Sequence, residues 1–593
     1  MSDYVQQSFA GGMNLLANDT RLEQNQYRAG FNVRNRYDII EPVLESQIDV
    51  ALPQGIVQEM VTFGNYVIVF VSGNAYFRYY TDTGWQQIVG FQMSTTAIRY
   101  WTVMVPVAIT NYARINQNIF FGTIPPGTSD ASSTVSLTSN VNSVLGFGQG
   151  NNPGLLVQDN INQPRFIYLS TTGPTTRITQ DYSQWAFTIV LATMIVSLDE
   201  REYVPIGNAM AWNDGILWIT SPDGNTLYRS VSGRPLDFVI NIDTDGQKGG
   251  DATTTSYSVG VGGIVCLRGM SDGTLFVAAS NANFSLRKSD ANGGLFGVGG
   301  TVFGEPMFDR RFLFNATCLS DRAILDSIGD TRFIDLTGVR SFNAVQQSGT
   351  NEGRNSPFTS DIQAAFGPKK NPVIQDANFA ASILYDDYEF YAVSTIFGPA
   401  LLVYDTINKC WSSIDIEQTD GKRIKILSKI ELSIQRLYAI TEDNQLYTLY
   451  IGPEYNRPKL RPISASPSLI KDERGYSVTP RGEIKLSELR CVFETITEDL
   501  LVVATPYVNN RLAGVPATPK EITYSAPITP SSEVMPDIDT MLANVLFSFP
   551  NCGQGWKAFT MIEWSGAGAL TQFIYTFNDL TPLNPLLSQG NTR

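Results

Sequence analysis

Residues 208–230 read NAMAWNDGILWITSPDGNTLYRS. Three short apolar segments are separated by two Asp-Gly pairs, Asp214-Gly215 and Asp223-Gly224. Asp-Gly between apolar segments is a strong signal for a tight β-hairpin, because glycine tolerates the positive φ that such turns require. The stretch therefore predicts a small antiparallel meander. A meander of this size exposes apolar faces and is not stable alone, so it must pack against others of its kind.

The same pattern of strand, short polar turn and strand recurs along the central two-thirds of the chain. Radial stacking of such sheets covers their apolar faces and leaves only short, protected edges. We therefore expect an all-β fold with a β-propeller of about seven blades; six or eight blades also fit the pattern. The further units lie at 61–80, within 95–190, and at 264–287, 316–342, 380–414 and 426–450.

The pattern changes on both sides of the repeats, which divides the chain into four parts. A polar stretch rich in Gly, Ser and Thr at about 122–154 indicates a surface insertion into one blade. Alternating apolar residues near the C-terminus predict a β-sandwich-like domain, with one short helix considered at 535–547. We expect an N-terminal arm and entry strand at 1–50, the propeller at 51–454, a Pro-rich linker or extended arm at 455–482, and the C-terminal β-domain at 483–593.

The charge balance is acidic. Lys and Arg total 42 against 56 Asp and Glu, so the net charge is -14. Proteins that grip nucleic acid usually carry a basic patch, because lysine and arginine neutralise phosphates. We expect any contact with DNA to be weak or repulsive, as in an acidic channel through which DNA slides.

Histidine is absent from the chain. Its absence excludes Ser-His-Asp and Cys-His catalysis and the common zinc sites. Chemistry that uses carboxylates alone, as in glycosidases, remains open. The cysteines are sparse, odd in number and without a CxxC pair, which predicts reduced thiols in the core. They are Cys266, Cys318, Cys410, Cys491 and Cys552.

Several motifs resemble sites of chemistry, and we interpret each as structural. NIDTDGQKGGDA (241–252) places Asp243 and Asp245 as in a calcium loop, but Ala252 stands where a bidentate glutamate belongs. SPDGNTLY (221–228) and MSDGTLFV (270–277) are similar to the Asp-box turns of sialidase propellers and are expected to be hairpin turns.

Neighbouring acids also give no specific signal. Asp386 with Asp387, and Glu45 with Asp49, are adjacent or nearly so, but sequence alone gives them no geometry. We predict no catalytic, cofactor-binding or metal site and expect a chain that is not an enzyme. The N-terminus lacks the features of a signal peptide, and no run approaches 18 apolar residues, so we expect no membrane insertion.

The N-terminal stretch FAGGMNLLANDTRLEQNQYRAGFNVRNRYDIIEPV (9–43) is the most specific feature. It resembles the opening of tail nozzle and packaged-DNA stabilisation (tail hub) proteins of short-tailed bacteriophages. In that family a Phe-x-Gly-Gly-Met/Ile-Asn stretch precedes a helix anchored by Asn-Gln and a strand with Asn-Val/Ala-Arg that ends near proline. The matching residues are Phe9, Gly11, Gly12, Met13, Asn14, Asn25, Gln26, Asn32, Val33, Arg34 and Pro42.

Two further stretches are similar to the same family. LYRSVSGRPLDFVINID (227–243) is similar to its Tyr-Ser-Arg-x-Gly-x-Pro-x-x-Phe run, with Arg and Ser in altered order. INQNIFFG (115–122) and NNPGLLVQDN (151–160) are similar to its strand, Asn-Pro turn and strand. The family's functional residues lie in gating loops that transfer poorly by motif, so no functional residue is carried over.

The resemblance implies a structural virion protein that forms the distal tail ring, assembled in the host cytoplasm. The implied partners are further copies of the chain in a homohexameric ring, portal-side and adaptor-side tail proteins, and tail fibres or spikes. The ring would extend the DNA channel, retain packaged DNA and let it pass without specific contacts. Six copies at -14 each would bring 84 negative charges to such a channel. Whether the ring is an open nozzle or a plugging hub stays undecided.

Two other functions remain open. One is a carbohydrate-active tail propeller, such as a depolymerase or sialidase-like enzyme, whose carboxylate pair would be among the 56 acids. The other is a monomeric protein-binding propeller. VYDTINKCWSSI (403–414), with Tyr404-Asp405 before a turn and Trp411 after it, resembles the closing strand of a kelch-type blade.

Overall fold

The structure is a computed structural model, and strands make up most of it. The helical elements among the residues it describes are three short 3-10 turns, η5 (Asp321–Ala323), η6 (Ser360–Phe366) and η7 (Ala377–Phe379). It describes residues 2–15, 22–23, 25–36, 38–88, 91–106, 153–162, 164–168, 187–188, 204–230, 253–256, 262–270, 272–280, 283–288, 308–314, 318–327, 329–342, 358–368, 371–431, 434–462, 484–524 and 541–579.

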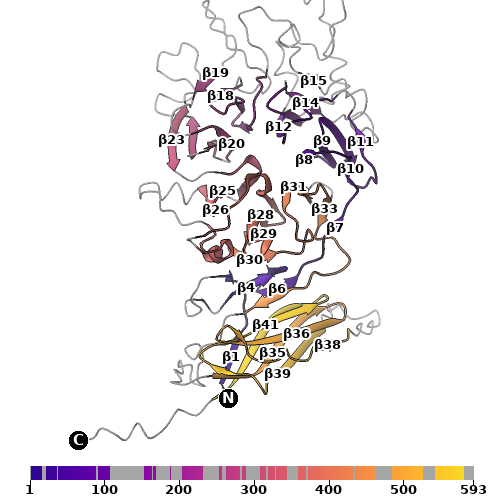
Figure 1. Ribbon diagram of the computed structural model, residues 1–593, viewed down its shortest axis with the longest axis vertical. Helices are drawn as coiled ribbons and strands as arrows, with labels where there is room; N and C mark the ends of the chain where they lie inside the picture. The colour runs from indigo at the N-terminus through magenta and orange to yellow at the C-terminus, as the bar shows by residue number, and fades with distance from the viewer. Residues whose placement is uncertain are drawn as a thin grey trace, which may run out of the picture.

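Seven antiparallel sheets of the described chain are arranged as blades in a ring, seen face-on in Figure 1. Blades 1 to 4 each contain four strands in chain order. Blade 1 holds β8 (Val57–Phe63), β9 (Tyr66–Val71), β10 (Asn74–Tyr79) and β11 (Gln86–Gln87); blade 2 holds β12 (Trp101–Pro106), β13 (Pro153–Gln158), β14 (Arg165–Tyr168) and β15 (Phe187–Thr188). Blade 3 holds β16 (Met210–Asn213), β17 (Ile216–Thr220), β18 (Thr226–Arg229) and β19 (Thr253–Ser256); blade 4 holds β20 (Ile264–Gly269), β21 (Leu275–Ala279), β22 (Asn283–Lys288) and β23 (Phe308–Phe314).

Blades 5 to 7 complete the ring. The last blade takes its outermost strand from the N-terminal part of the chain, because β7 pairs with β33. Blade 5 holds β24 (Ile324–Ser327), β25 (Asp330–Asp335) and β26 (Gly338–Ser341); blade 6 holds β27 (Ala381–Tyr385), β28 (Tyr388–Thr395), β29 (Gly398–Asp405) and β30 (Cys410–Asp415). Blade 7 holds β31 (Ile424–Ile430), β32 (Arg436–Thr441), β33 (Leu446–Leu449) and β7 (Gln47–Ile48).

The first strand of each blade faces the centre of the ring. Neighbouring blades touch through these strands, for example β31 with β8 and β16 with β20. The second strands are sandwiched between neighbouring blades, so all five residues of β17 and of β21 are buried. The tight turns have the chemistry that the sequence suggested, since Asp214 and Gly215 both adopt positive φ. The predicted all-β propeller of about seven blades is confirmed.

The C-terminal domain is a sandwich of two sheets and lies below blade 6 in Figure 1. One sheet contains β39 (Met541–Ser548), β35 (Ile484–Ile496), β42 (Ala569–Asp579), β6 (Ile39–Pro42), β5 (Val33–Arg36), β1 (Ser2–Gln6) and β40 (Gln554–Gly555). The facing strands are β34 (Lys459–Arg461), β41 (Ala558–Ser565), β36 (Leu500–Val508), β37 (Arg511–Leu512) and β38 (Lys520–Ile522). Between the sheets, the rings of Phe493 and Trp564 meet edge to face at 5.7 Å.

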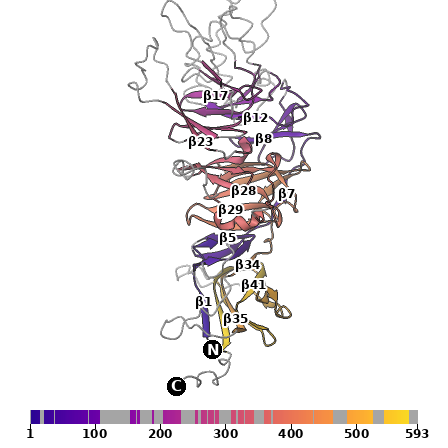
Figure 2. The same cartoon turned by 60° about the vertical axis from the view of Figure 1, so that its left-hand side comes forward.

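A single ten-stranded sheet joins the propeller to this domain. β4 (Ala29–Phe31) pairs in parallel with β30 of blade 6 and antiparallel with β34, which in turn pairs with β41. Figure 2 shows β5 between β29 of blade 6 and β34 of the C-terminal domain. The buried core is also continuous across this junction, since Trp411 of blade 6 and Phe573 of the sandwich belong to one hydrophobic cluster.

The N-terminal strands therefore belong to both domains. We call the strands of residues 2–48 the N-terminal clamp: β1, β5 and β6 lie in the sandwich, β4 lies in the junction, and β7 closes the propeller. The remaining clamp strands, β2 (Gly12–Met13) and β3 (Gln26–Tyr27), pair with each other in parallel. Gln26 thus lies in a strand, and the helix implied for this region by the resemblance is absent at that residue.

One local expectation needs correction. The helix considered at 535–547 is wrong in its second half, because residues 541–548 form β39. Buried and exposed residues alternate from 543 to 548, which is the period of a strand on the face of a sandwich. Within the linker or extended arm expected at 455–482, residues 459–461 form β34, which carries ladder hydrogen bonds on both sides. Of the insertion expected at 122–154, only 153–154 lie within the described residues, and they open β13.

Candidate functional site

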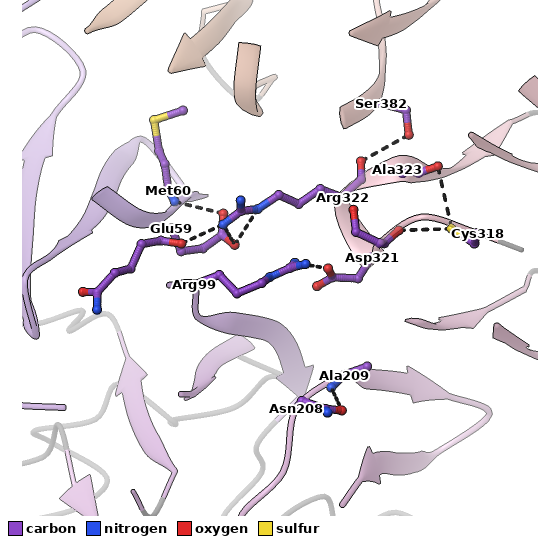
Figure 3. A network of polar contacts seen from close by, with 12 residues as sticks. Glu59, Met60, Arg99, Asn208, Ala209, Cys318, Asp321, Arg322, Ala323 and Ser382 are labelled. Atoms are coloured by element: carbon purple, nitrogen blue, oxygen red, sulfur yellow. Dashed lines mark hydrogen bonds and ion pairs between the residues drawn. The ribbon is translucent and has the colours of Figure 1, made fainter. Parts of the chain in front are cut away.

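Charged side chains from several blades meet at the middle of the ring in what we call the central hub. It consists of Glu59, Arg99, Asp321, Arg322 and Lys425. Arg322 Nη2 lies 2.8 Å from Glu59 Oε2, and Arg99 pairs with Asp321. Figure 3 shows both pairs side by side. Glu59 lies on β8 of blade 1 whereas Arg322 lies on η5, directly before β24 of blade 5, so their contact crosses the centre.

Backbone groups complete the hub. Arg322 Nη2 donates to the Gln58 carbonyl at 2.6 Å, and Lys425 Nζ donates to the Val57 carbonyl on the same strand. Ser382 Oγ of blade 6 donates to the Arg322 carbonyl at 3.4 Å. The network therefore links blades 1, 2, 5, 6 and 7, which together make up most of the ring.

Burial dominates the electrostatics of the hub. The side chains of Arg322 and Glu59 are only 11% and 8% exposed. Burial lowers the pKa of the Arg322 guanidinium, and the Glu59 carboxylate opposes this effect. Burial also lowers the pKa of Lys425 to about 8, an effect that the neighbouring Arg322 increases. The acids of the hub are engaged by arginines, so the arrangement suits holding blades in place rather than proton transfer.

The glycine pair of the N-terminal stretch lies in a close contact between the clamp and blade 6. Gly12 has φ +68°, and a Cβ there would lie 2.6 Å from Cys410 Sγ and 2.7 Å from the Trp411 carbonyl oxygen. At Gly11, a Cβ would meet the Asn25 side chain at 2.5 Å. Gly12 needs glycine because β2 lies directly against β30, and Gly11 needs it because the side chains of Asn25 and Gln26 within the clamp fill the space of a Cβ.

Two asparagines of the clamp are fully buried and bridge separate parts of the chain. The Asn35 amide donates to the Phe9 carbonyl at 2.5 Å, and its backbone N–H donates to Ser412 Oγ at 2.9 Å. Asn32 has φ 55°, and its Nδ2 donates to Glu417 Oε2 at 3.2 Å. These buried polar groups fix the path of the clamp because an unpaired amide in the core is costly.

Arg34 forms the charged centre of the same junction. Its Nη2 lies 2.8 Å from Asp415 Oδ2, and the Asp415 side chain is fully buried. Tyr450 of blade 7 donates to the same carboxylate oxygen at 2.7 Å, and Ser413 donates to Asp415 Oδ1 at 2.6 Å. The Asp415 carboxylate raises the pKa of Arg34 against the effect of burial. One ion pair thus ties the clamp to blades 6 and 7.

The resemblance residues that the structure describes are concentrated in this junction. Phe9 and Val33 are fully buried, and Met13 is 2% exposed. Phe9 packs edge to face on Tyr27 at 6.3 Å. Met13 Sδ accepts from the Gly30 N–H at 3.4 Å, where β4 passes β2. The sequence pattern therefore corresponds to packing at a domain junction rather than to a catalytic constellation.

The candidate motifs for chemistry fall into two groups. Asp243 and Asp245 of the calcium-like loop lie outside the described residues. So do residues 231–243 of the stretch LYRSVSGRPLDFVINID. The Asp-box-like segments are hairpin turns, as expected. Asp223 accepts from the Asn225 N–H at 3.1 Å in one, and Asp272 accepts from the Thr274 N–H at 2.9 Å in the other.

The neighbouring acids also have structural partners. Asp49 accepts from Arg78 at 2.6 Å and from Thr448 at 2.7 Å, which ties β7 to blade 7 and to blade 1. Asp386 pairs with Arg36 at 3.2 Å, and the Asp387 carbonyl accepts from the Thr406 N–H at 3.0 Å. Asp49 and Asp386 are therefore each paired with an arginine, Arg78 and Arg36 respectively.

Among the described residues, no group of three or more Cys, Asp or Glu side chains is arranged to hold a metal ion. The five cysteines are buried and free, as the sequence predicted. No described helix is long and apolar enough to cross a membrane. An open acidic cleft of about 590 Å³ lies between the turns of blades 3, 4 and 5, with Asp214, Asp272, Asp326 and Asp330 in its lining.

Comparison with known proteins identifies no family. No protein-family model and no curated protein matches the chain. Among solved structures, the virginiamycin B lyase from Staphylococcus aureus is 9% identical with a TM-score of 0.35, over 69% of this chain and 99% of that one. A streptogramin B lyase is 9% identical with a TM-score of 0.34, over 70% and 98% of the two chains.

A third solved structure is the extracellular domain of a putative hybrid two-component system from B. thetaiotaomicron. It is 10% identical with a TM-score of 0.30, and the match covers 68% of this chain but only 40% of that one. Likenesses at this level carry nothing about what the chain binds or does. The propeller assignment rests on the chain's own sheets and their order around the ring.

No local sequence pattern indicates the central hub. Arg322 is 263 positions from Glu59 along the chain, and Asp321 is 222 positions from Arg99. Neither pair falls in a recognisable motif. Only the closure of seven blades brings these residues to one place.

Proposed function

We propose that the chain is a structural subunit of the tail of a short-tailed phage, forming the distal nozzle or hub ring. In this function six copies surround a DNA channel, retain the packaged genome and support fibres or spikes. The observation that carries the proposal is the N-terminal stretch from Phe9 to Pro42, whose pattern is similar to that family.

The position of these residues in the fold supports the proposal. Gly12, Asn35 and Arg34 fix the clamp against blade 6, and the clamp strands continue into the C-terminal sandwich. A subunit of a conduit needs a fixed angle between its domains, because an aligned channel requires identical geometry in every copy. A continuous sheet and a shared hydrophobic core provide that fixed angle.

The charge of the chain supports the same function. The net charge of -14 gives the chain more carboxylates than basic side chains, and Asp214 and Asp272 line an open cleft between blades 3, 4 and 5. Carboxylates repel phosphates, so DNA that passes such a surface is not retained by counterion release. This property suits passage of a genome of any sequence and does not suit a sequence-reading protein.

The proposal is tested on particles that contain the chain. A C-terminal affinity tag would be detected by antibody-bound gold in electron micrographs, with a tagged major capsid protein as the control for label distribution. We expect gold at the distal tail and six copies per particle by quantitative mass spectrometry, a ring of about 392 kDa from six chains of 65.3 kDa. Purified particles without the chain, or with isolated single copies of it, would contradict the proposal.

A further inference from the structure

The seven-stranded sheet of the C-terminal sandwich has open edges at β39 and at β1. Four of its strands follow the order β39-β35-β42-β1, and each neighbouring pair in this order is antiparallel. No strand of the described chain pairs with the outer side of β39 or of β1. A free strand edge presents a row of backbone donors and acceptors, so each of these edges can receive a further strand.

The hydrogen bonds of the sheet show which residues face the open edge of β39. The Phe549 N–H donates to the Ser487 carbonyl at 2.8 Å, so the residues two and four positions earlier also bond to β35. Successive residues of a strand point their backbone groups to opposite sides. The backbone groups of Asn544, Leu546 and Ser548 therefore point outward. The side chains of these three residues are exposed, on the face of the sheet away from the sandwich core.

The open edge of β1 follows from the same alternation across the sheet. Arg490 of β35 lies opposite Leu546 on one side and Ile574 on the other, and Ile574 lies opposite Val5. These four residues therefore form one cross-strand row on the outer face. Hydrogen-bonded and non-bonded pairs alternate along and across the sheet, so the backbone groups of Val5, like those of Leu546, point away from it. The same holds for Asp3, two residues earlier.

The two edges match each other in direction, hydrogen bonding and face. Four antiparallel strands in a row run alternately, so β39 and β1 run in opposite directions. β39 of one copy can therefore lie against β1 of the next with both copies in the same orientation. Outward backbone groups then meet, and side chains of the outer face lie beside one another. Two-fold pairing of β39 with itself would leave β1 open, whereas head-to-tail pairing covers both edges.

The side chains on the two edges favour pairing. Leu546 is 44% exposed and Val5 is 36% exposed, and both are large apolar side chains. Placed opposite each other they cover one another, and Ser548 then lies opposite Asp3, where its hydroxyl can donate to the carboxylate. Residues 541–548 contain no charged residue and no proline, which are the residues that commonly protect a free edge from other strands.

We propose that copies of this chain join head to tail through β39 of one copy and β1 of the next, with Leu546 opposite Val5. The contact continues the sandwich sheet from copy to copy. A head-to-tail contact repeats until the assembly closes into a ring or grows into a filament. The inference stands independently of the proposed tail function, because the contact uses only residues of this chain and needs no phage particle.

Disulfide cross-linking of the full chain tests the contact. The double variant Val5→Cys, Leu546→Cys carries one new thiol on each edge, and the native cysteines are buried. Copper phenanthroline passes two electrons from a pair of thiols to dissolved oxygen, so that two S–H bonds are replaced by one S–S bond. Within one copy the two positions are three strand spacings apart, roughly 14 Å, which is too far for a disulfide. We expect a ladder of dimers and higher oligomers on a non-reducing gel, which a reductant removes.

Single variants distinguish the head-to-tail contact from other arrangements. Val5→Cys alone and Leu546→Cys alone should stay monomeric, because the joint then holds only one thiol. Dimers from Leu546→Cys alone would show two-fold pairing of β39 instead. A double variant that stays monomeric would show that the two edges do not meet. Either result would overturn the proposal.

A substitution at Ser548 separates strand pairing from the fold. Adding Ser548→Pro to the double variant removes one outward N–H that makes no bond to β35, so the thermal melting temperature should change little. The cross-linked fraction should fall about fivefold, the effect of one lost hydrogen bond. Ser548→Ala is the matched control, because it also removes the hydroxyl but keeps the N–H. Equal cross-linking with proline and with alanine would show that the backbone of β39 does not form the joint, and would overturn the proposal.

Discussion

The central hub and the N-terminal clamp both join distant parts of the chain, but they do so by different physical means. The hub joins blades through long charged side chains across the middle of the ring. The clamp joins two domains through backbone pairing, glycine contacts and a shared apolar core. Side-chain ion pairs are enough to hold blades together where neighbouring blades already pack against each other. Where two domains meet, β-sheet continuity is needed to fix their angle.

The largest expected effect concerns the buried ion pair of the hub. Arg322→Met should lower the free energy of unfolding by about 3–5 kcal/mol, because it leaves Glu59 buried and unpaired. The double variant Arg322→Met, Glu59→Met should recover most of this loss, since no buried charge then remains. Urea unfolding followed by tryptophan fluorescence measures both. A single variant as stable as the wild type would show that the hub does not hold the ring.

A single methyl group added to the clamp should lower the free energy of unfolding. Gly12→Ala combines a left-handed backbone with a clash against blade 6, and should cost about 2–4 kcal/mol. Gly421→Ala is the matched control, because Gly421 has φ +73° but no atom within 4 Å of the added Cβ. The control should lose only about 1 kcal/mol. Equal losses in urea unfolding would mean that the contact with Cys410 and Trp411 is not tight.

The more exposed of the two ion pairs in the hub should contribute less to stability than the buried one. The side chains of Arg99 and Asp321 are 18% and 23% exposed, more than those of the Arg322–Glu59 pair. A double-mutant cycle with Arg99→Met and Asp321→Asn should give a coupling energy of about 1 kcal/mol. The coupling should shrink further in 1 M NaCl. A coupling as large and as salt-resistant as that of the buried pair would contradict this ranking.

A pH dependence is also expected at Lys425. Its pKa is about 8 in the fold and its ordinary value is 10.5, so the unfolded chain binds more protons between these values. Stability from this group therefore rises with pH across that window. Relative to Lys425→Met, the wild type should gain stability between pH 8 and 10. Thermal melting of both proteins across this range tests it, and a constant difference would show that Lys425 stays charged in the fold.

Local sequence patterns predicted the blades well. Each meander is a short-range structure, and Asp-Gly turns such as Asp214-Gly215 specify its hairpins without help from the rest of the chain. The helix considered at 535–547 failed because periodicity over so few residues does not separate helix from strand, and pairing of β39 with β35 decides the outcome. The strand β34 was not predicted because prolines and basic residues flank it. Its ladder partners are also far away in sequence.

The candidate sites divide in the same way. The Asp-box-like turns could be interpreted as structural from sequence, because their hydrogen bonds are local. The hub could not be found, because it collects residues from segments hundreds of positions apart. The clamp stood between these cases: its glycines were recognisable, but their contact with Cys410 was not.

The sequence by itself determined that the chain is all-β, that its meanders repeat, and that histidine-based chemistry is excluded. These properties follow from turn residues, alternation and composition, which act over a few positions. Only the tertiary structure decided that residues 2–48 belong to both domains and that Arg322 meets Glu59. Ring closure and sheet continuity depend on long-range pairing, which no local pattern encodes.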